Sequence, residues 1–362
     1  MKSVQTILHV IDTTGPGGAE TIFTQLTLEA KVRGYKSIAL IRGPGWVQNE
    51  LKKMEIETYV YDCKGSFNIK FLLKFIELIR KKKVDLIQAH LLGSSVYASL
   101  AGLIARVPVI STFHGFVDIS EKERFTAIKF LSVRFGSQKV VAVTEQLHER
   151  ITSLKYLKKQ NVIVIANGVD TNTFPKKSSS INIDVAQIGC LGNVRKAKNY
   201  PLAIEVLNLL VNSHGKEVHL HIAGDDKNAL ASECKDIAES LHLTSHITWH
   251  GFIDSVPAYL TSLDVYLLTS SSEGHPLALT QAMSIGLPIV TTRCGVEHVV
   301  TEGKSALIAE NGNAKDIADK VCLLLNNAEL RVGLSSKAAE EARTKWSLKA
   351  TFDKYFLLYG LK

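Results

Sequence analysis

The sequence lacks the features that define several classes of protein. Its apolar runs all fall well short of the ~20 residues that a membrane-spanning helix needs. It has only five cysteines among 362 residues, and their spacing fits neither a disulfide framework nor a metal site, which favours free thiols in a reducing cytoplasm. Residues 4–11 form a short apolar segment that leads into Asp12 and Gly15, so we expect a first strand there and no signal peptide.

The composition of the chain is typical of a soluble globular protein with two domains. Hydrophobic residues make up 46% of the chain and charged residues 22%, and 362 residues exceed one ordinary core. Residues 1–175 hold 24 Lys+Arg against 15 Asp+Glu, a net charge of +9, whereas residues 176–362 have a net charge of −1. A basic half indicates an anionic partner for the first domain only. We expect a membrane surface and no nucleic acid, because aromatic and basic residues occur together on two expected helices, 67–83 and 121–135. For the helix at 67–83, an apolar face that packs on the core, with a solvated basic end, is the alternative.

Residues 270–290 have the clearest local organisation in the chain. An apolar run at 264–268 predicts a buried strand that leads into a polar turn, and a second apolar strand follows the stretch. Pro276 suits the first position of a helix, and Gly286 is placed to end that helix. A helix N-terminus above the carboxyl edge of a sheet is a phosphate site. A carboxylate beside it would repel phosphate, so we expect Glu273 to bind hydroxyl groups of a neighbouring moiety.

Two turns in the first half also join a strand to a helix. Gly17 and Gly18 follow the first strand, and their lack of a Cβ would let the backbone approach a diphosphate, although a purely structural turn is equally consistent with the pattern. His114 ends a strand within residues 108–116. At that position in an α/β sheet it would point into the crevice where ligands bind, and the alternative is a histidine with a structural role.

A loop in the second half carries closely spaced cations. The strand at 185–191 leads into Arg195, Lys196 and Lys198. Two cations three residues apart suit two phosphate oxygens, and a solvated basic loop is the alternative. The Asp pair at 225–226 has no third ligand at a suitable spacing, so we assign it turn and capping roles and expect no metal.

These motifs together resemble the retaining glycosyltransferases of family four, which have the GT-B fold. Residues 273–283, EGHPLALTQAM, are similar to the Glu-x7-Glu signature of that family, with Gln281 in place of the second Glu and His275 in place of the usual aromatic residue. The resemblance spans nearly the whole chain. It includes the glycine turn at 17–20, the Thr-x-His-Gly turn at 112–115, NGVD at 167–170, the basic loop at 192–198, the Gly-Phe pair at 251–252 and the loop at 294–297.

The resemblance implies an α/β fold of the GT-B type, with two Rossmann-like domains that face an interdomain cleft. Residues 1–175 would form the acceptor-side domain. Residues 176–345, which begin with a polar linker at 176–182, would form the domain that binds the nucleotide-sugar. The remaining residues, 346–362, would form a helix that returns to the first domain.

The resemblance also implies an activity. The expected enzyme is a metal-independent hexosyltransferase without a cofactor, which moves a sugar from a UDP-linked donor to a glycan or lipid-linked acceptor in the synthesis of cell-surface polysaccharide or lipopolysaccharide. It would act in the cytoplasm, peripherally on the inner face of the cell membrane. Catalytic roles would fall to His114, Glu273, Lys198 and Arg195. Donor-binding roles would fall to Gly17, Gly18, Asn193, Gly251, Phe252, His275, Pro276, Leu277, Ala278 and Gln281.

Other functions stay open at this point. The Gln281 substitution is compatible with a non-catalytic protein that binds nucleotide-sugars. A GT-B sugar-nucleotide epimerase would need acid–base carboxylates and histidines that the sequence does not identify. A membrane-bound scaffold would account for the basic first half alone.

Overall fold

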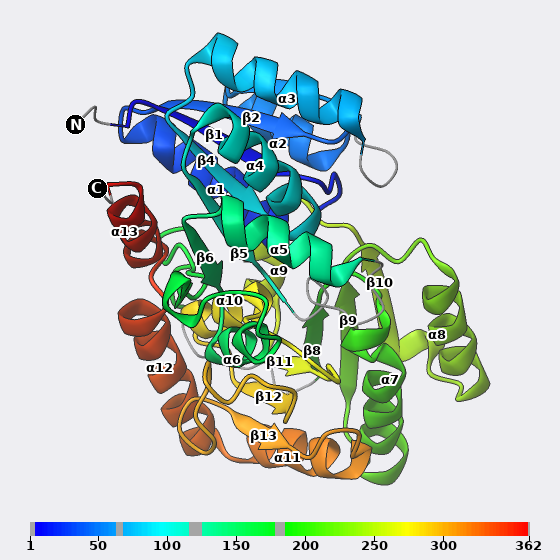
Figure 1. Ribbon diagram of the computed structural model, residues 1–362. Coiled ribbons are helices and arrows are strands. Elements are labelled where there is room, and N and C mark those ends of the chain that lie inside the picture. Colours follow the sequence, from blue (N-terminus) through cyan, green and yellow to red (C-terminus); the bar gives the residue numbers. More distant parts are fainter. Residues whose placement is uncertain (1–3, 63–67, 116–124, 178–184, 361–362) are drawn as a thin grey trace. The chain divides into compact units, whose positions relative to one another are not determined.

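The computed structural model describes residues 4–62, 68–115, 125–177 and 185–360 (Figure 1). The chain forms two compact units. We call Met1–Asn167 with Ala350–Lys362 the N-terminal unit, and Gly168–Lys349 the C-terminal unit.

The first domain was expected to extend to residue 175, but the segment that follows Asn167 packs on the C-terminal unit. Val169 and Phe174 are buried in that unit's core. The Phe174 carbonyl accepts a hydrogen bond from Ser284 Oγ at 2.7 Å. The Lys177 N–H donates to the Ile285 carbonyl at 2.8 Å. Most of the expected linker, residues 176–182, lies outside the described residues.

The N-terminal unit is built on a seven-stranded parallel sheet. The strands lie in the order β3-β2-β1-β4-β5-β6-β7, and each adjacent pair is parallel. The order reverses between β1 and β4, which is where ligands bind in open α/β sheets. The strands are β1 (Thr6–Ile11), β2 (Lys36–Ile41), β3 (Glu57–Val60), β4 (Leu86–His90), β5 (Val109–Phe113), β6 (Lys139–Ala142) and β7 (Val162–Val164).

Helices cover both faces of this sheet. Successive residues of β1 alternate between the two faces: Val10 packs with α3 and α4, whereas Ile11 packs with α1 and α2. The helix expected at 121–135 is observed as α5, and residues 121–124 lie outside the described part of the chain. The helices are α1 (Gly18–Val32), α2 (Trp46–Lys53), α3 (Ile69–Lys82), α4 (Leu92–Ala105), α5 (Thr126–Gly136) and α6 (Glu145–Ser153).

The last helix, α13 (Leu348–Tyr359), packs on the N-terminal unit, which confirms the predicted return of the chain. Tyr359 is buried and donates its hydroxyl hydrogen to Gln88 Oε1 at 3.1 Å. Asp353 pairs with Arg33 at 2.6 Å. The chain therefore leaves this unit after Asn167 and re-enters it at Ala350.

The C-terminal unit has a six-stranded parallel sheet in the order β10-β9-β8-β11-β12-β13. This order also reverses once, between β8 and β11. Two buried clusters lie on its opposite faces, one with α7, α8 and α11 and the other with α9, α10 and α12. The elements are β8 (Ala186–Leu191), α7 (Tyr200–Asn208), β9 (Val218–Ala223), α8 (Ala229–Ser240), β10 (Ile247–Gly251), α9 (Val256–Ser262), β11 (Val265–Leu268), α10 (Leu277–Ile285), β12 (Ile289–Thr292), β13 (Leu307–Ala309), α11 (Ala314–Asn326) and α12 (Ala328–Lys345).

Both units are Rossmann-like, which confirms the predicted fold class. The strand, turn, helix and strand expected around residues 264–291 are β11, α10 and β12 with the loop between them. Pro276, however, is the N-cap of α10 and not its first helical residue, because its ψ of 116° is extended. Among the helices in the described part of the chain, none has the length and apolar character needed to cross a bilayer.

Candidate functional site

The two loops at the switch point of the C-terminal sheet meet through an ion pair. One loop follows β8 and the other follows β11, and these strands are neighbours. Lys198 Nζ lies 2.8 Å from Glu273 Oε1, with side-chain exposures of 21% and 13%. Gly192 makes room for this lysine, because a Cβ at that position would lie 2.9 Å from Lys198 Cε. Two predicted catalytic residues are thus brought into contact at the ligand-binding edge of the sheet.

The loop around Glu273 is held by a series of hydrogen bonds. Ser270 Oγ donates to Glu273 Oε1 at 2.6 Å. The Glu273 N–H donates to the Cys294 carbonyl at 2.7 Å. Gly295 has φ +98°, and a Cβ there would lie 2.8 Å from the Glu273 carbonyl oxygen. The carboxylate therefore has a fixed position beside Lys198.

The N-terminus of α10 adds hydrogen-bond donors next to this pair. Leu277 and Ala278 are the first two residues of the helix after the Pro276 N-cap. Their N–H groups have no preceding turn of helix to donate to, and they lie at the positive end of the helix dipole. The first turn contains no acidic residue. A cation, a carboxylate and an N–H-rich helix end are therefore presented by adjacent segments.

His275 packs inside the C-terminal unit. Its ring centroid lies 4.7 Å from that of Trp346 in an edge-to-face arrangement and 5.7 Å from that of His298. Burial lowers its pKa to about 3, so the ring is neutral at pH 7. His275 stands at the position of the aromatic residue in the family signature, and because its ring is buried, a contact between His275 and a donor would have to come from its backbone.

Most of the other predicted residues of this unit lie in the loops at the same edge of the sheet. Asn193 Oδ1 accepts a hydrogen bond from the Asp225 N–H at 3.0 Å, which joins the loop after β8 to the loop after β9. Arg195 is exposed at the start of the turn that contains Lys198. The Gly251 carbonyl accepts from the Gly224 N–H at 2.8 Å. The remaining two are Phe252, whose exposed fraction is 50%, and Gln281, which is half-buried on α10.

The N-terminal unit presents the other predicted residues at its own switch point. Gly17 is the N-cap of α1 and Gly18 its first residue. A Cβ at Gly17 would overlap the Glu20 carboxylate, so the close approach of this side chain to the helix start requires glycine. His114 follows β5, and burial lowers its pKa to about 3. The three predicted residues therefore stand at the carboxyl edge of one sheet.

Sequence reasoning missed functional candidates on the same edges. His90 ends β4 and contacts His114. Asp12 follows β1, and burial raises its pKa to about 6. Ser270 supports Glu273. The signal that identified His114, a polar residue where a strand ends before a turn, was also present at His90 and Asp12.

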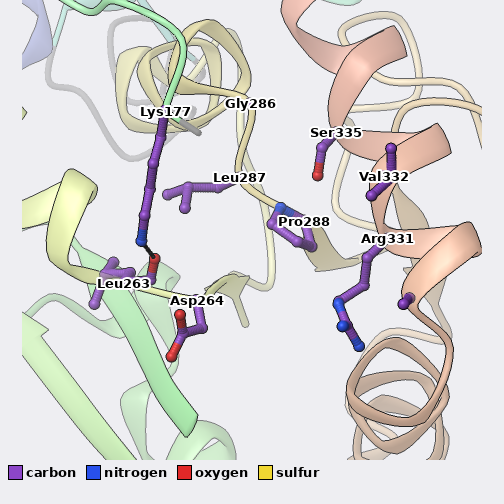
Figure 2. Close-up of a pocket in the computed structure, with 10 residues that line it drawn as sticks. Lys177, Leu263, Asp264, Gly286, Leu287, Pro288, Arg331, Val332 and Ser335 are labelled. Atoms are coloured by element: carbon purple, nitrogen blue, oxygen red, sulfur yellow. Dashed lines mark hydrogen bonds between the residues drawn. The ribbon is translucent and has the colours of Figure 1, made fainter. Parts of the chain in front are cut away.

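A small cavity at the opposite edge of the C-terminal sheet is separate from these residues (Figure 2). Its volume is about 70 Å³, and it lies where β11 and β12 begin. Its polar groups already have partners: Lys177 Nζ donates to the Leu263 carbonyl at 2.9 Å, Asp264 accepts from the Gln187 N–H, and Arg331 donates to two carbonyls that end α11. Because these charges are engaged within the protein, the cavity is not a candidate for an anionic ligand.

Comparison with known proteins identifies the family. The model described as Glycosyltransferase Family 4 matches residues 16–173, and the model described as Glycosyl transferases group 1 matches residues 172–341. The chain belongs to this family. The glycosyltransferase is 22% identical to an N-acetyl-alpha-D-glucosaminyl L-malate synthase from Bacillus anthracis over 95% of its own chain and 93% of the relative. It is also 22% identical to the capsular polysaccharide biosynthesis glycosyltransferase CapM from Staphylococcus aureus, over 81% of each chain.

Solved structures give the same fold. HepE from Anabaena, crystallised with UDP and glucose, superposes with a TM-score of 0.87 over 98% of this chain and 99% of HepE, at 18% identity. TarM from S. aureus, in a complex that contains UDP, superposes with a TM-score of 0.79 over 99% of this glycosyltransferase and 100% of TarM, at 14% identity. At these identities the likeness shows the architecture alone.

Proposed function

We propose that this glycosyltransferase moves a hexose-type sugar from a UDP-linked donor to a glycan or lipid-linked acceptor, with retention of configuration, in the synthesis of cell-surface polysaccharide. The observation that carries the proposal is the contact of Lys198 with Glu273 beside the N-terminus of α10. The names of relatives support the pathway: besides CapM, the lipopolysaccharide core glycosyltransferase LpsE of Rhizobium meliloti is 22% identical over 96% of each chain. HepE, whose fold is similar, was crystallised with UDP and glucose.

The leaving diphosphate is the group that the cations would stabilise. Negative charge on the diphosphate grows as the glycosidic bond breaks, so donors that are already in place lower the barrier most. Lys198, Arg195 and the N–H groups of Leu277 and Ala278 are these donors in the proposed mechanism. No divalent metal is required for this role. Lys198 would then share its charge between Glu273 and a phosphate oxygen.

The carboxylate and the amide would bind the neutral parts of the donor. Glu273 is fixed by Ser270 and can accept hydrogen bonds from sugar hydroxyls. Gln281, in place of the family's second glutamate, offers an amide oxygen to the ribose hydroxyls. An amide oxygen is a weaker acceptor than a carboxylate, so this contact would be weaker than in most of the family. Gly251 and Phe252, after β10, would lie near the base.

The Gln281 amide is also the observation that favours a second candidate, a protein that binds nucleotide-sugars without transferring them. The two functions differ in turnover and not in binding. We would therefore measure two quantities on the purified chain. The first is the shift in melting temperature with UDP, UDP-glucose, UDP-galactose and UDP-N-acetylglucosamine, since a ligand that binds only the native state raises it. The second is UDP release from each sugar nucleotide.

We expect UDP itself and at least one UDP-sugar to raise the melting temperature, with slow UDP release from that sugar. Binding without release, even when lipid-linked and glycan acceptors are added, would favour the non-catalytic candidate. An absence of any shift with UDP would contradict the donor assignment. GDP- and ADP-glucose serve as controls for the choice of base.

A lipid-linked acceptor would lie at a membrane, and we propose that the N-terminal unit binds an anionic membrane surface. Helices α4 and α5 pack closely, because Gly136 lies against the backbone of Ser99 where a Cβ would overlap it. Large apolar side chains are exposed on or next to these two helices, which also carry cations, and this combination is typical of interfacial helices. The apolar residues are Leu103, Ile104, Phe125, Ile128, Leu131 and Phe135, and the cations are Arg106, Lys129 and Arg134.

Sedimentation with liposomes tests this surface. We expect the chain to sediment with vesicles of phosphatidylglycerol and phosphatidylcholine, less with phosphatidylcholine alone, and less again in high salt. The variant Ile104→Ser/Phe135→Ser should reduce binding to anionic vesicles. A matched control is Val332→Ser, which changes a similarly exposed apolar residue of the C-terminal unit. Equal binding to both kinds of vesicle, or to neither, would contradict the proposal.

A further inference from the structure

The turn that carries Lys198 is bound by the segment that follows β11. The Ala197 carbonyl accepts a hydrogen bond from the Ser271 N–H at 2.8 Å. The next carbonyl, that of Lys198, accepts from the hydroxyl of Thr269 at 3.1 Å. The same segment carries Glu273, whose carboxylate pairs with the ammonium group of Lys198. One stretch of chain therefore contacts both the main chain of Lys198 and the end of its side chain.

The hydroxyl of Thr269 has a fixed position. Thr269 is buried as the first residue after β11, and its β-branched side chain has few rotamers. The two residues that follow it are tied to other parts of the unit. Thr292 Oγ1 on β12 donates to the Ser270 carbonyl at 2.5 Å. Asn311 Nδ2, beyond β13, donates to the Ser271 carbonyl at 3.0 Å. The donor hydroxyl is thus held rigidly at the edge of the sheet.

Lys198 needs such support because its charge lies at the end of a flexible side chain. A lysine ammonium group is a point charge on a four-carbon stem, so its position depends on how the main chain is held. Lys198 ends a short 3₁₀ turn, and the next residue, Asn199, has φ +51° in the left-handed region. The hydroxyl of Tyr200 donates to the Gly192 carbonyl at 2.5 Å, which joins the two ends of this loop. Thr269 contacts the loop at the residue that carries the charge.

We propose that Thr269 is a positioning residue for glycosyl transfer. Its hydroxyl fixes the main chain of Lys198, so that the ammonium group is already in place when a diphosphate binds. Donors that are in place before the bond breaks contribute most to stabilising the charge that develops on the leaving group. This inference rests on the proposed role of Lys198 beside the diphosphate. Thr269 acts through Lys198 and does not touch the substrate itself.

Variants of Thr269 separate its hydroxyl from its packing. Thr269→Val keeps the shape of the side chain and removes the donor to the Lys198 carbonyl. Thr269→Ser keeps the hydroxyl and removes the methyl group. Thr269→Ala leaves room for a water molecule at the Lys198 carbonyl, and it replaces Thr269→Val in every measurement if that variant does not fold. Melting temperature reports whether each variant folds.

Thr27→Val is the matched control, because it removes a hydroxyl of the same kind from the N-terminal unit. Thr27 is fully buried on α1, and its hydroxyl donates to the Phe23 carbonyl at 2.6 Å. The control variant therefore reports what the loss of a buried threonine hydroxyl does to the fold alone. We expect Thr27→Val to lower the melting temperature and to leave ligand binding and turnover unchanged.

Binding of three probes gives a readout that does not depend on activity. Titration calorimetry measures the Kd of UDP, of inorganic pyrophosphate and of uridine, which has the base and ribose but no diphosphate. We expect Thr269→Val to weaken UDP and pyrophosphate by about three- to tenfold, the usual effect of losing one hydrogen bond, and to leave uridine unchanged. Thr269→Ser should bind all three probes almost as the wild-type chain does.

A double-mutant cycle tests whether Thr269 acts through Lys198. In a folded Lys198→Ala chain, the ammonium group that Thr269 positions is absent, so adding Thr269→Val should weaken pyrophosphate no further. A purely structural role would give losses that add. With the most active UDP-sugar, Thr269→Val should lower kcat by about tenfold and change KM less, because the interaction is strongest in the transition state.

Each outcome decides one point. The proposal is overturned if Thr269→Val weakens uridine as much as UDP, if it weakens neither UDP nor pyrophosphate, if Thr269→Ser behaves like Thr269→Val, or if the losses in the cycle add. If the wild-type chain binds pyrophosphate but not UDP, the proposed donor is wrong, and pyrophosphate still decides the role of Thr269. If it binds UDP but releases none from any sugar, the proposed transfer fails, and the binding cycle still decides that role. If it binds neither, both proposals fail.

Discussion

The two units have the same kind of parallel sheet but place different chemistry at its switch point. In the C-terminal unit a lysine and a carboxylate meet, Lys198 with Glu273. In the N-terminal unit the contact is between two neutral histidines, His90 and His114. Full charges suit a diphosphate, whereas neutral imidazoles suit hydroxyl groups, which need hydrogen bonds without a strong field. In the proposed mechanism, therefore, the loops and not the strand order decide which part of a nucleotide-sugar each unit binds.

The largest expected effect comes from removing the charges of the C-terminal unit. We expect Lys198→Ala and Glu273→Ala each to reduce UDP release by about a hundredfold or more, because each removes an interaction with the breaking bond or the sugar. Because the ion pair is largely buried, removing one partner should also lower the free energy of unfolding, by up to about 3–5 kcal/mol, and melting temperature checks that each variant folds. Lys235→Ala is the matched control, since Lys235 forms a 2.8 Å ion pair with Asp226 in the same unit. Wild-type turnover in a folded Lys198→Ala or Glu273→Ala enzyme would contradict the assignment.

The neutral histidines of the N-terminal unit lead to a prediction about acid stability. Burial lowers the pKa of His9 and of His114 from 6.5 to about 3 in the folded chain. Each therefore stabilises the fold fully above pH 6.5, and this contribution is lost as pH falls from 6.5 toward 3, by about 1.4 kcal/mol per pH unit per histidine. Asp12, whose pKa is raised from 3.8 to about 6, opposes part of this loss between those two values.

Urea unfolding at pH 7 and pH 5 measures this effect. His9→Leu should reduce the loss of stability between the two pH values by about 2 kcal/mol, because the unfolded variant has one fewer group to protonate. His242→Leu, which changes an exposed histidine, serves as the control. An unchanged slope in His9→Leu would show that His9 is not a buried neutral group.

Gly295 allows a smaller test of the support around Glu273. At φ +98° a non-glycine residue is strained, and its Cβ would press on the Glu273 carbonyl. We expect Gly295→Ala to lower the free energy of unfolding by about 1–3 kcal/mol and also to lower kcat. Gly303→Ala has a positive φ of +67° but no atom within 4 Å of the added Cβ, so it should affect stability alone. Equal effects of both variants on kcat would contradict a supporting role for Gly295.

The elements around the site could be predicted from the sequence, but the contacts between them could not. The sequence predicts both ends of α10, which lie at Pro276 and Gly286. Pro276 is the N-cap and not the predicted first helical residue, and the pattern does not separate the two positions because they share a similar φ. Lys198 and Glu273 were each predicted, yet they are 75 residues apart and meet only because β8 and β11 are neighbours. The polar segment at 176–182 predicts a domain boundary there, whereas the buried Phe174 ties the preceding residues to the C-terminal unit.

The smallest expected effect concerns Gln281, where this chain departs from the family signature. Gln281 is half-buried on α10, so a glutamate fits the same space. We expect Gln281→Glu to change the free energy of unfolding by less than about 0.5 kcal/mol, as for most substitutions at accessible positions. UDP release should be unchanged or slightly faster, because a carboxylate is a stronger acceptor for ribose hydroxyls than an amide. Gln187→Glu, on β8, is the control for an added charge in this unit. If Gln281→Glu abolishes turnover in a folded enzyme, the amide N–H group has a role of its own, and the C-terminal unit binds its nucleotide differently from the family pattern.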